Sequence, residues 1–350
     1  MLFSRAARFP ILAALLALAL LQPAQARERY TVAWTLYAGS MPLAYADETG
    51  ILQKWGDRYG FDLEAVQMND YIEAITQFSL GQFDAVIAMS LDALTIPAAS
   101  GVDTTVVLPL STSNGSDGIV VRGQDKTLAD LEGLRINLVE LSGSHYMLVR
   151  ALESVGLRER DVTVVNTSDA DIASVFEAAD TRAVATWKPQ LSQILAQYPD
   201  TTLVFDSSDI HGELLDVMIA RSDALADNPD LGRAIAGAWF EAAALLRTDH
   251  PKHGDFMGFT AATLNTDRAG ARNQLSTIDF LSPAQGLELI VGEDFAETQK
   301  QITHFAFDHG LLGEGVPNAG FVGIETGRGT VIGNPDNVKL HFPTTWLEAQ

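Results

Sequence analysis

Cysteine is absent from the 350-residue chain, so no disulfide bond can contribute to its stability. We therefore expect the fold to be held by packing of its hydrophobic residues, which make up 47% of the sequence. The sequence also lacks the lipidated cysteine that would tether an exported protein to a membrane. We expect no lipid anchor.

Basic residues are scarce compared with acidic ones. The chain has 23 Lys and Arg against 45 Asp and Glu, which gives a formal net charge of -22 at pH 7. This balance argues against nucleic acid and against anionic membrane surfaces as partners. It permits a cationic ligand without establishing one, because solubility alone also selects acidic surfaces.

Long apolar stretches are missing except for residues 10–21 near the N-terminus. Arg5 and Arg8 precede this stretch, and Ala-Gln-Ala follows it at 24–26. The pattern is typical of a secretory signal peptide and too short for a bilayer-spanning helix. We predict a signal peptide over residues 1–26 and a soluble protein in the periplasm of a Gram-negative bacterium. The remaining chain, about 324 residues, is longer than one core usually supports, which favours two domains.

Recognisable catalytic patterns are also missing. The sequence has no nucleophile elbow, no phosphate-binding glycine loop and no pair of metal-binding cysteines. His250 and His253 flank Pro251 beyond a predicted helix end, which favours a solvated loop over a metal site. Ser142 lies close to His145, but residues adjacent in sequence rarely form a Ser/His catalytic pair. We predict a protein that is not an enzyme and needs neither cofactor nor metal.

Short apolar runs alternate with helical patterns along the chain. Residues 30–34, 61–68 and 83–89 have the pattern of strands, and residues 43–59 have that of a helix broken by Gly50. This alternation predicts an α/β fold with mostly parallel sheets and helices on both faces.

Two polar stretches interrupt the alternation. Residues 111–118, rich in Ser, Gly and Asn, predict a linker into a second α/β set, and residues 206–216 predict the return. We therefore expect residues 27–115 to begin lobe I, residues 116–213 to form lobe II, and residues 214–350 to complete lobe I with C-terminal helices. Two lobes joined by two crossovers make a hinged clamp with a central ligand cleft.

Ligands of such folds bind at the C-terminal ends of strands and at helix N-termini. The candidate ligand-binding residues at these positions are Trp34, Tyr37, Tyr71, Ser90, Asp92, Asn114, Glu140, Ser142, His145, Trp187, Glu213 and Asp216. They include many acids and aromatics, and the only base beside any of them at a strand end is Lys188. Carboxylates and aromatic faces favour a small cation over an anion.

Several candidates also have ordinary structural explanations. Asp70 and Asp92 could cap helices, Trp34 and Trp187 could be core aromatics, and His145 could be hydrogen-bonded only within its own helix. The sequence leaves these alternatives open.

Glu140 and Asp216 are harder to explain as structural residues. Glu140 follows the apolar run 136–139, and Asp216 stands between Leu215 and Val217. A buried carboxylate costs free energy unless it is paired, and neither acid has a Lys or Arg nearby in the sequence. We expect both to supply negative charge to a binding site.

The sequence resembles the nitrate/sulfonate/taurine-type substrate-binding proteins of ABC importers over nearly all of the chain after the predicted signal peptide. GQFDAVIAMSLDAL at 81–94, LADLEGLRINLVELSGSHYMLVRALESVGL at 128–157 and AVATWKP at 183–189 carry this resemblance. It implies a two-lobed, type II periplasmic binding protein that works with a membrane permease. The segments VNTSDADI, TWKP and SHY are similar to a subgroup found with urea carboxylase-type enzymes and linked to guanidine.

The resemblance and the acids together predict guanidinium as the ligand, bound by a monomer. Glu140 departs from the anion-binding branches, in which a small or apolar residue is more usual. Urea, taurine or nitrate remain alternative ligands. A periplasmic enzyme, a ligand sensor for a membrane receptor and a pyrimidine-precursor synthase remain alternative functions of the same fold.

Overall fold

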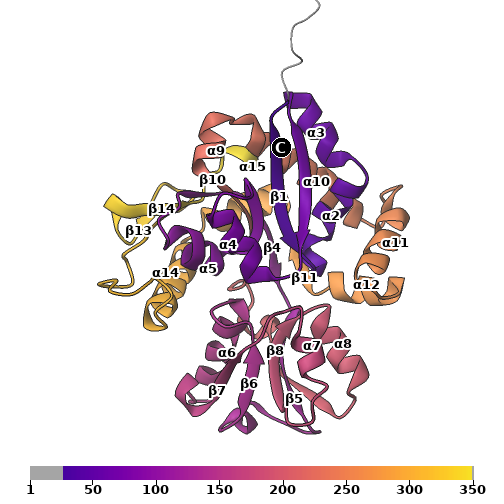
Figure 1. The fold of residues 1–350 in the computed structure, drawn as a ribbon, viewed down its shortest axis with the longest axis vertical. Helices are drawn as coiled ribbons and strands as arrows, with labels where there is room; N and C mark the ends of the chain where they lie inside the picture. The colour runs from indigo at the N-terminus through magenta and orange to yellow at the C-terminus, as the bar shows by residue number, and fades with distance from the viewer. Residues whose placement is uncertain (1–26, 349–350) are drawn as a thin grey trace, which may run out of the picture.

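The computed structural model describes residues 27–348, which fold into two lobes with a separate sheet in each (Figure 1). The predicted signal peptide at 1–26 lies outside these residues. Within residues 27–348, no helix is both long and apolar enough to cross a membrane. The two lobes confirm the α/β class predicted from the alternating pattern.

The larger lobe, called lobe I, is built on a nine-stranded sheet with the order β13-β12-β14-β4-β10-β3-β1-β2, and β11 pairs with β4. Its strands are β1 (Arg29–Thr35), β2 (Asp62–Met68), β3 (Ala85–Met89), β4 (Thr104–Ser113), β10 (Leu215–Arg221), β11 (Ile278–Phe280), β12 (Gly323–Glu325), β13 (Val331–Ile332) and β14 (Val338–His341).

Helices from both ends of the chain belong to this lobe, and most of them pack on the sheet (Figure 1). They are α2 (Met41–Glu48), α3 (Ile51–Tyr59), α4 (Tyr71–Ser79), α5 (Ser90–Ala93), α9 (Ser222–Asp227), α10 (Asp230–Ala243), α11 (His253–Thr263), α12 (Arg268–Leu275), α13 (Pro283–Ile290), α14 (Glu293–Asp308) and α15 (Thr345–Glu348). The tail from Gly310 is rich in glycine, which is typical of a loop, but it contributes three of the strands and α15.

The smaller lobe, called lobe II, has a five-stranded sheet with the order β7-β6-β8-β5-β9. Its elements are β5 (Asp117–Arg122), β6 (Arg135–Leu138), α6 (Gly143–Ser154), β7 (Thr163–Asn166), α7 (Ile172–Val175), β8 (Ala183–Trp187), α8 (Gln190–Gln197) and β9 (Thr201–Asp206). Figure 1 shows this lobe below lobe I.

Both sheets are mixed, so the prediction of mostly parallel sheets is wrong. In lobe I, β1 runs parallel to β2 and β3, but β10 runs antiparallel to β3 and β4. In lobe II, β5 runs antiparallel to β8 and β9. The antiparallel strands include those that follow a crossover, since β5 follows the first and β10 the second, and β11 and β13 are also antiparallel to a neighbour.

Local sequence signals place several helix ends correctly. Gly50 has a left-handed backbone with φ of 73° and separates α2 from α3, as the break in the helical pattern predicts. The Asp70 side chain accepts a hydrogen bond from the Glu73 amide at 2.9 Å and caps α4. This cap fixes the direction in which Tyr71 enters the space between the lobes.

The first crossover is short and mostly buried, although its Ser/Gly/Asn-rich composition is typical of a solvated linker. Ser111 to Ser113 continue β4, and β5 begins at Asp117, so only three residues turn between the two sheets. Ser113 is buried, and its hydroxyl contacts the hydroxyl of Ser207 at 2.7 Å and the carboxylate of Asp117 at 2.5 Å. The polar residues are there because they form a buried hydrogen-bond network.

Candidate functional site

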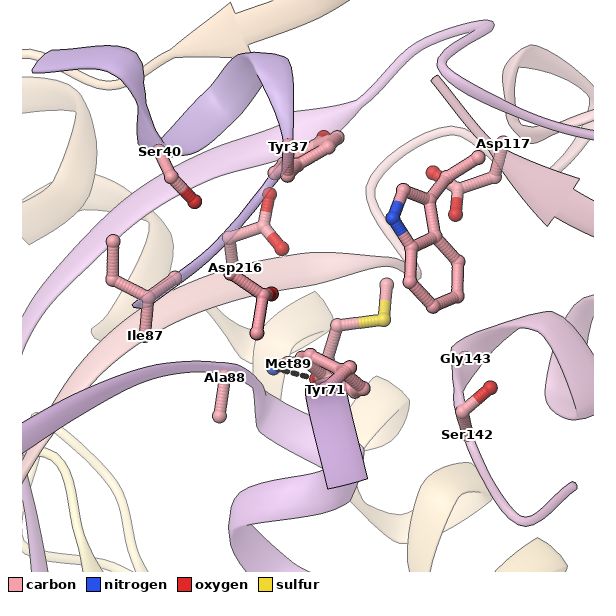
Figure 2. Close-up of a pocket in the computed structure, with 12 residues that line it drawn as sticks. Tyr37, Ser40, Tyr71, Ile87, Ala88, Met89, Asp117, Ser142, Gly143 and Asp216 are labelled. Carbon is pink, nitrogen blue, oxygen red and sulfur yellow. Dashed lines mark hydrogen bonds between the residues drawn. The ribbon is translucent and has the colours of Figure 1, made fainter. Parts of the chain in front are cut away.

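A small cavity lies between the lobes, where β1, β3 and β10 of lobe I approach β5, β8 and the start of α6 of lobe II. Its volume is about 40 Å³. Figure 2 shows the 12 residues that line it, which are Thr35, Tyr37, Ser40, Tyr71, Ile87, Ala88, Met89, Asp117, Ser142, Gly143, Trp187 and Asp216. One water needs roughly 10–15 Å³ by the same measure, so the cavity has room for about three or four waters or a compact ligand of that size.

Asp216 supplies one carboxylate to the cavity from β10. It is 7% exposed, and its Oδ2 accepts a hydrogen bond of 2.9 Å from the Ser111 hydroxyl on the neighbouring β4. Burial and then the nearby charge of Asp117 raise the pKa of Asp216 to about 7. The apolar residues on either side of Asp216 in the sequence predict a buried acid, and this prediction is confirmed.

Asp117 supplies a second carboxylate from lobe II, at the first residue of β5. It is 4% exposed, and burial raises its pKa to about 6. The hydrogen bond from Ser113 and the charge of Lys188 lower this pKa by a smaller amount. Figure 2 shows Asp117 and Asp216 on different sides of the cavity. A ligand bound in the cavity would therefore lie between two acids, one from each lobe.

The lining residues include no Lys, Arg or His. The nearby base is Lys188, whose Nζ donates a hydrogen bond of 3.1 Å to the Thr277 hydroxyl and whose side chain does not line the cavity. Burial lowers the pKa of Lys188, while the charges of Asp206 and Asp117 raise it. The cavity therefore presents carboxylates that no lining base neutralises.

Two aromatic rings from opposite lobes close the cavity. Tyr71 at the start of α4 and Trp187 at the end of β8 meet edge to face, with ring centroids 5.6 Å apart and an interplanar angle of 67°. The Tyr71 hydroxyl donates to Asp92 Oδ2 at 2.5 Å and accepts from the Met89 amide at 2.8 Å. These bonds hold the tyrosine ring in place, and Asp92 acts through Tyr71 from outside the cavity.

Glycine at the start of α6 leaves room for the Met89 side chain of the opposite lobe. A Cβ at Gly143 would lie 2.1 Å from Met89 Sδ. Ser142 caps the helix by accepting from the Ser144 amide at 3.1 Å. The small residues of this corner therefore allow the two lobes to approach one another beside the cavity.

The structure brings together Tyr37, Tyr71, Ser142, Trp187 and Asp216 of the candidates predicted from sequence. It does not place Trp34, Ser90, Asp92, Asn114, Glu140, His145 or Glu213 in the cavity lining. Trp34 is part of the lobe I core, and Ser90 and Asp92 lie buried behind the cavity in α5. Asn114 instead donates a hydrogen bond of 3.1 Å to Asp279.

The interpretation of Glu140 as a buried strand-end acid is wrong. β6 ends at Leu138, Val139 is buried, and Glu140 points outward and is exposed. It lines a separate surface groove with Asp70 and Glu73, so its charge is solvated and needs no partner. The sequence pattern does not show where the chain leaves the sheet.

Glu213 and His145 are engaged elsewhere. Arg150 holds Glu213 with two hydrogen bonds of 2.8 and 2.9 Å, and the Tyr146 hydroxyl donates to the same carboxylate. His145 is buried in α6, with its Nε2 facing Glu159 at 3.3 Å. Neither side chain lines the cavity.

Asp117 and Gly143 are lining residues that the candidate set leaves out. Asp117 follows a Ser/Gly/Asn-rich stretch that resembles a linker, so the sequence does not mark it as a site residue. The apolar run directly after Asp117 is nevertheless a signal for the start of a strand. Asp117 contributes the charge that we expected from Glu140.

Comparison with known proteins agrees with this two-lobed arrangement. The family model described as "NMT1/THI5 like" matches residues 55–253. The chain belongs to the NMT1/THI5-like family. A putative binding protein of Brucella abortus is 24% identical over 240 residues, covering 68% of this chain and 72% of that protein. A taurine-binding periplasmic protein of Escherichia coli is 27% identical over 152 residues, covering 43% of this chain and 47% of that protein.

Among solved structures, the alkanesulfonate-binding protein SsuA of Xanthomonas axonopodis pv. citri bound to MOPS superposes with a TM-score of 0.70. It is 19% identical and covers 83% of this chain and 96% of that protein. This NMT1/THI5-like chain therefore has the two-lobed, type II fold of periplasmic binding proteins, which confirms the fold predicted from sequence.

Proposed function

We propose that this protein is the periplasmic substrate-binding component of an ABC importer and that its ligand is a small planar cation, guanidinium. Its membership of the NMT1/THI5-like family and its similarity to periplasmic binding proteins support the role in import. The function is binding without turnover, and the partner is a membrane permease. The observation that carries the ligand assignment is the pair of buried carboxylates, Asp117 and Asp216, in a cavity whose lining has no basic side chain.

The chemistry of guanidinium matches that lining. Its planar N–H groups can donate to carboxylates on either side, and its charge offsets the cost of burying two acids. Its face or edge can contact the rings of Trp187 and Tyr71. It has four non-hydrogen atoms, about the size for which the cavity has room.

Sulfonate ligands fit this lining less well. The taurine- and alkanesulfonate-binding relatives are named for ligands that carry an anionic group. An anion beside Asp117 and Asp216 would meet like charge in a poorly solvated space, and no lining Lys, Arg or His is present to offset it.

Urea is the second candidate because of the proton affinity of Asp216. With a pKa of about 7, this acid is partly protonated near neutral pH and could then donate a hydrogen bond to a neutral carbonyl. Guanidinium binding instead needs the carboxylate, so the two ligands differ in their dependence on pH.

Isothermal titration calorimetry with guanidinium chloride, urea, taurine and sodium nitrate, each at pH 8, tests the proposal. We expect guanidinium to bind most tightly, with sodium chloride as the control for ionic strength. Tighter binding of taurine or nitrate would overturn the cationic ligand. Sustained ammonia release from guanidine or urea would overturn the binding-only function.

A further inference from the structure

A second cluster of titratable residues joins the two lobes away from the cavity. His145 in α6 and Glu159 in the short helix η4 (Glu159–Asp161) belong to lobe II, whereas His309 directly follows α14 of lobe I. The Nε2 of His309 lies 2.6 Å from Glu159 Oε2, and the Nε2 of His145 lies 3.3 Å from Glu159 Oε1. One carboxylate thus faces two imidazoles from opposite lobes.

The remaining ring nitrogens define where the protons lie. His309 Nδ1 contacts the Phe305 carbonyl oxygen at 2.8 Å, so this nitrogen must carry a proton and donate. His145 Nδ1 accepts from the Leu141 amide at 3.1 Å, so it carries none, and a neutral His145 is protonated at Nε2. Burial lowers the pKa of His145, which favours this neutral form.

His309 is the group whose charge decides the contact. With its Nδ1 proton already donated to Phe305, a neutral His309 would turn the lone pair of Nε2 toward the Glu159 carboxylate. Only the imidazolium has a second proton to donate to Oε2 at 2.6 Å. Glu159 then accepts from His309 in an ion pair between the lobes, whereas the buried Nε2 of His145 has no hydrogen-bond partner among the described residues.

We propose that His309 and Glu159 form a proton-operated clamp, beside the neutral His145, that favours the closed arrangement of the lobes when His309 is charged. At higher pH the clamp loses its proton, and the contact between α14 and η4 weakens. This inference concerns closure of the lobes and does not depend on the identity of the ligand in the cavity.

The surroundings of the clamp contain charges of both signs. Charged or titratable side chains of the adjoining groove come from α6 and α14 and are Arg150, Glu153, Glu297, Lys300, His304 and Asp308. Glu140 contributes a weaker field at His145. His304 is the other histidine of this groove, so its effect has to be separated from that of His309.

The same three residues are spaced closely enough to ligate a metal ion, with their ligand atoms all within 4.8 Å of one another. A metal on His145 Nε2 would require the proton on Nδ1, where it would oppose the Leu141 amide proton. The observed hydrogen bonds therefore favour the proton over the metal.

Pulsed electron spin resonance on ligand-free protein tests the clamp. The native chain has no cysteine, so Leu80→Cys in lobe I and Val155→Cys in lobe II, both at exposed positions, would carry the only labels. We expect the closed population, relative to the open one, to fall about three- to fivefold between pH 5.5 and 8.5, the size for a half-exposed ion pair. In the same labelled background, His309→Gln should reduce this dependence, and the part that remains belongs to Asp117 and Asp216, whose charges also face each other across the lobes. His304→Gln and the distant His250→Gln should leave the dependence unchanged.

Each outcome decides the proposal. A closed population that does not change with pH, or the same pH dependence in His309→Gln, would overturn it. Closure at pH 8.5 that requires Zn²⁺ and disappears with EDTA would make the cluster a metal site and overturn the clamp. Because no ligand is added, these results are independent of whether guanidinium is the ligand.

Discussion

Tyr71 and Trp187 meet edge to face across the two lobes, with ring centroids 5.6 Å apart. Each ring lines the cavity, and each comes from the end of an element that its own lobe holds in place. Contact with the ligand and closure of the lobes therefore depend on the same two rings, because a ligand enclosed by both rings also fixes the distance between the lobes.

Removing the indole of Trp187 should weaken the binding of every planar ligand. We expect Trp187→Ala to reduce binding of guanidinium by about 1–2 kcal/mol, the range for a desolvated cation–π contact, and to reduce urea binding by less. Trp187→Phe should retain most of the affinity, since it keeps an aromatic face. Calorimetry measures both variants, and an unchanged affinity in Trp187→Ala would place the ligand away from this ring.

The charge of Asp216 should separate guanidinium from urea. We expect Asp216→Asn to weaken guanidinium binding by roughly 2–4 kcal/mol, the scale for removing one partner of a buried charge pair, and to change urea binding less. Glu140→Gln is the matched control, because this acid is exposed and outside the cavity lining. Equal losses for both ligands in Asp216→Asn would mean that this side chain shapes the site without selecting charge.

The contrast between these two acids shows what the sequence predicts and where it fails. Both follow or interrupt apolar runs, so their local patterns are alike. Asp216 lies within β10, which is paired on both sides, and its position in the ladder fixes its side chain toward the cavity. Glu140 lies beyond the end of β6, where the chain has already turned outward. The end of a strand depends on its neighbours in the sheet, which local sequence does not specify.

The sequence does not show that the first crossover is buried, for a related reason. Ser and Gly between two strand patterns usually mark a solvated loop. In this protein, Ser111 and Ser113 are buried and donate to Asp216 and Asp117, the two acids of the cavity. The partner of Ser111 is 105 residues away, and Ser113 also contacts Ser207, so local sequence does not show that these hydroxyls have buried partners. The alternating strands and helices, by contrast, depend on local periodicity, and they predicted the α/β class correctly.

Guanidinium binding should strengthen as pH rises. Burial raises the pKa of Asp216 from 3.8 to about 7, so in the empty protein a proton must leave before the carboxylate can pair with a cation. We expect the affinity to increase about tenfold or more between pH 5.5 and 8, since each pKa unit corresponds to a tenfold change. Asp216→Asn should reduce this slope. Binding that is equally tight at both pH values would contradict a cation paired with Asp216.

The same shift predicts how the stability of the ligand-free protein depends on pH. A folded pKa above the unfolded value means that Asp216 contributes stability below pH ~4 and loses it as pH rises toward 7. We therefore expect thermal denaturation of Asp216→Asn, compared with the native chain, to show its largest relative gain in stability at pH 7 and above. A constant difference between pH 4 and 8 would show that Asp216 has the same pKa in both states.

Gly143 should control affinity through a residue of the opposite lobe. Its missing Cβ leaves space for Met89, since an added carbon would lie 2.1 Å from Sδ. Met89 is flexible and lines the cavity, so we expect Gly143→Ala to push this side chain into the ligand space and weaken binding by about 1–3 kcal/mol, the usual cost of overpacking.

The double variant Gly143→Ala with Met89→Ala tests that mechanism. Removing the methionine side chain should recover part of the affinity lost in Gly143→Ala, because the two residues act on one contact. Gly254→Ala is the matched control: this glycine also lies in the first turn of a helix, and the atom nearest to an added Cβ is 4.0 Å away. Strictly additive losses in the double variant, measured by calorimetry with guanidinium, would show that Gly143 acts on the helix rather than on Met89.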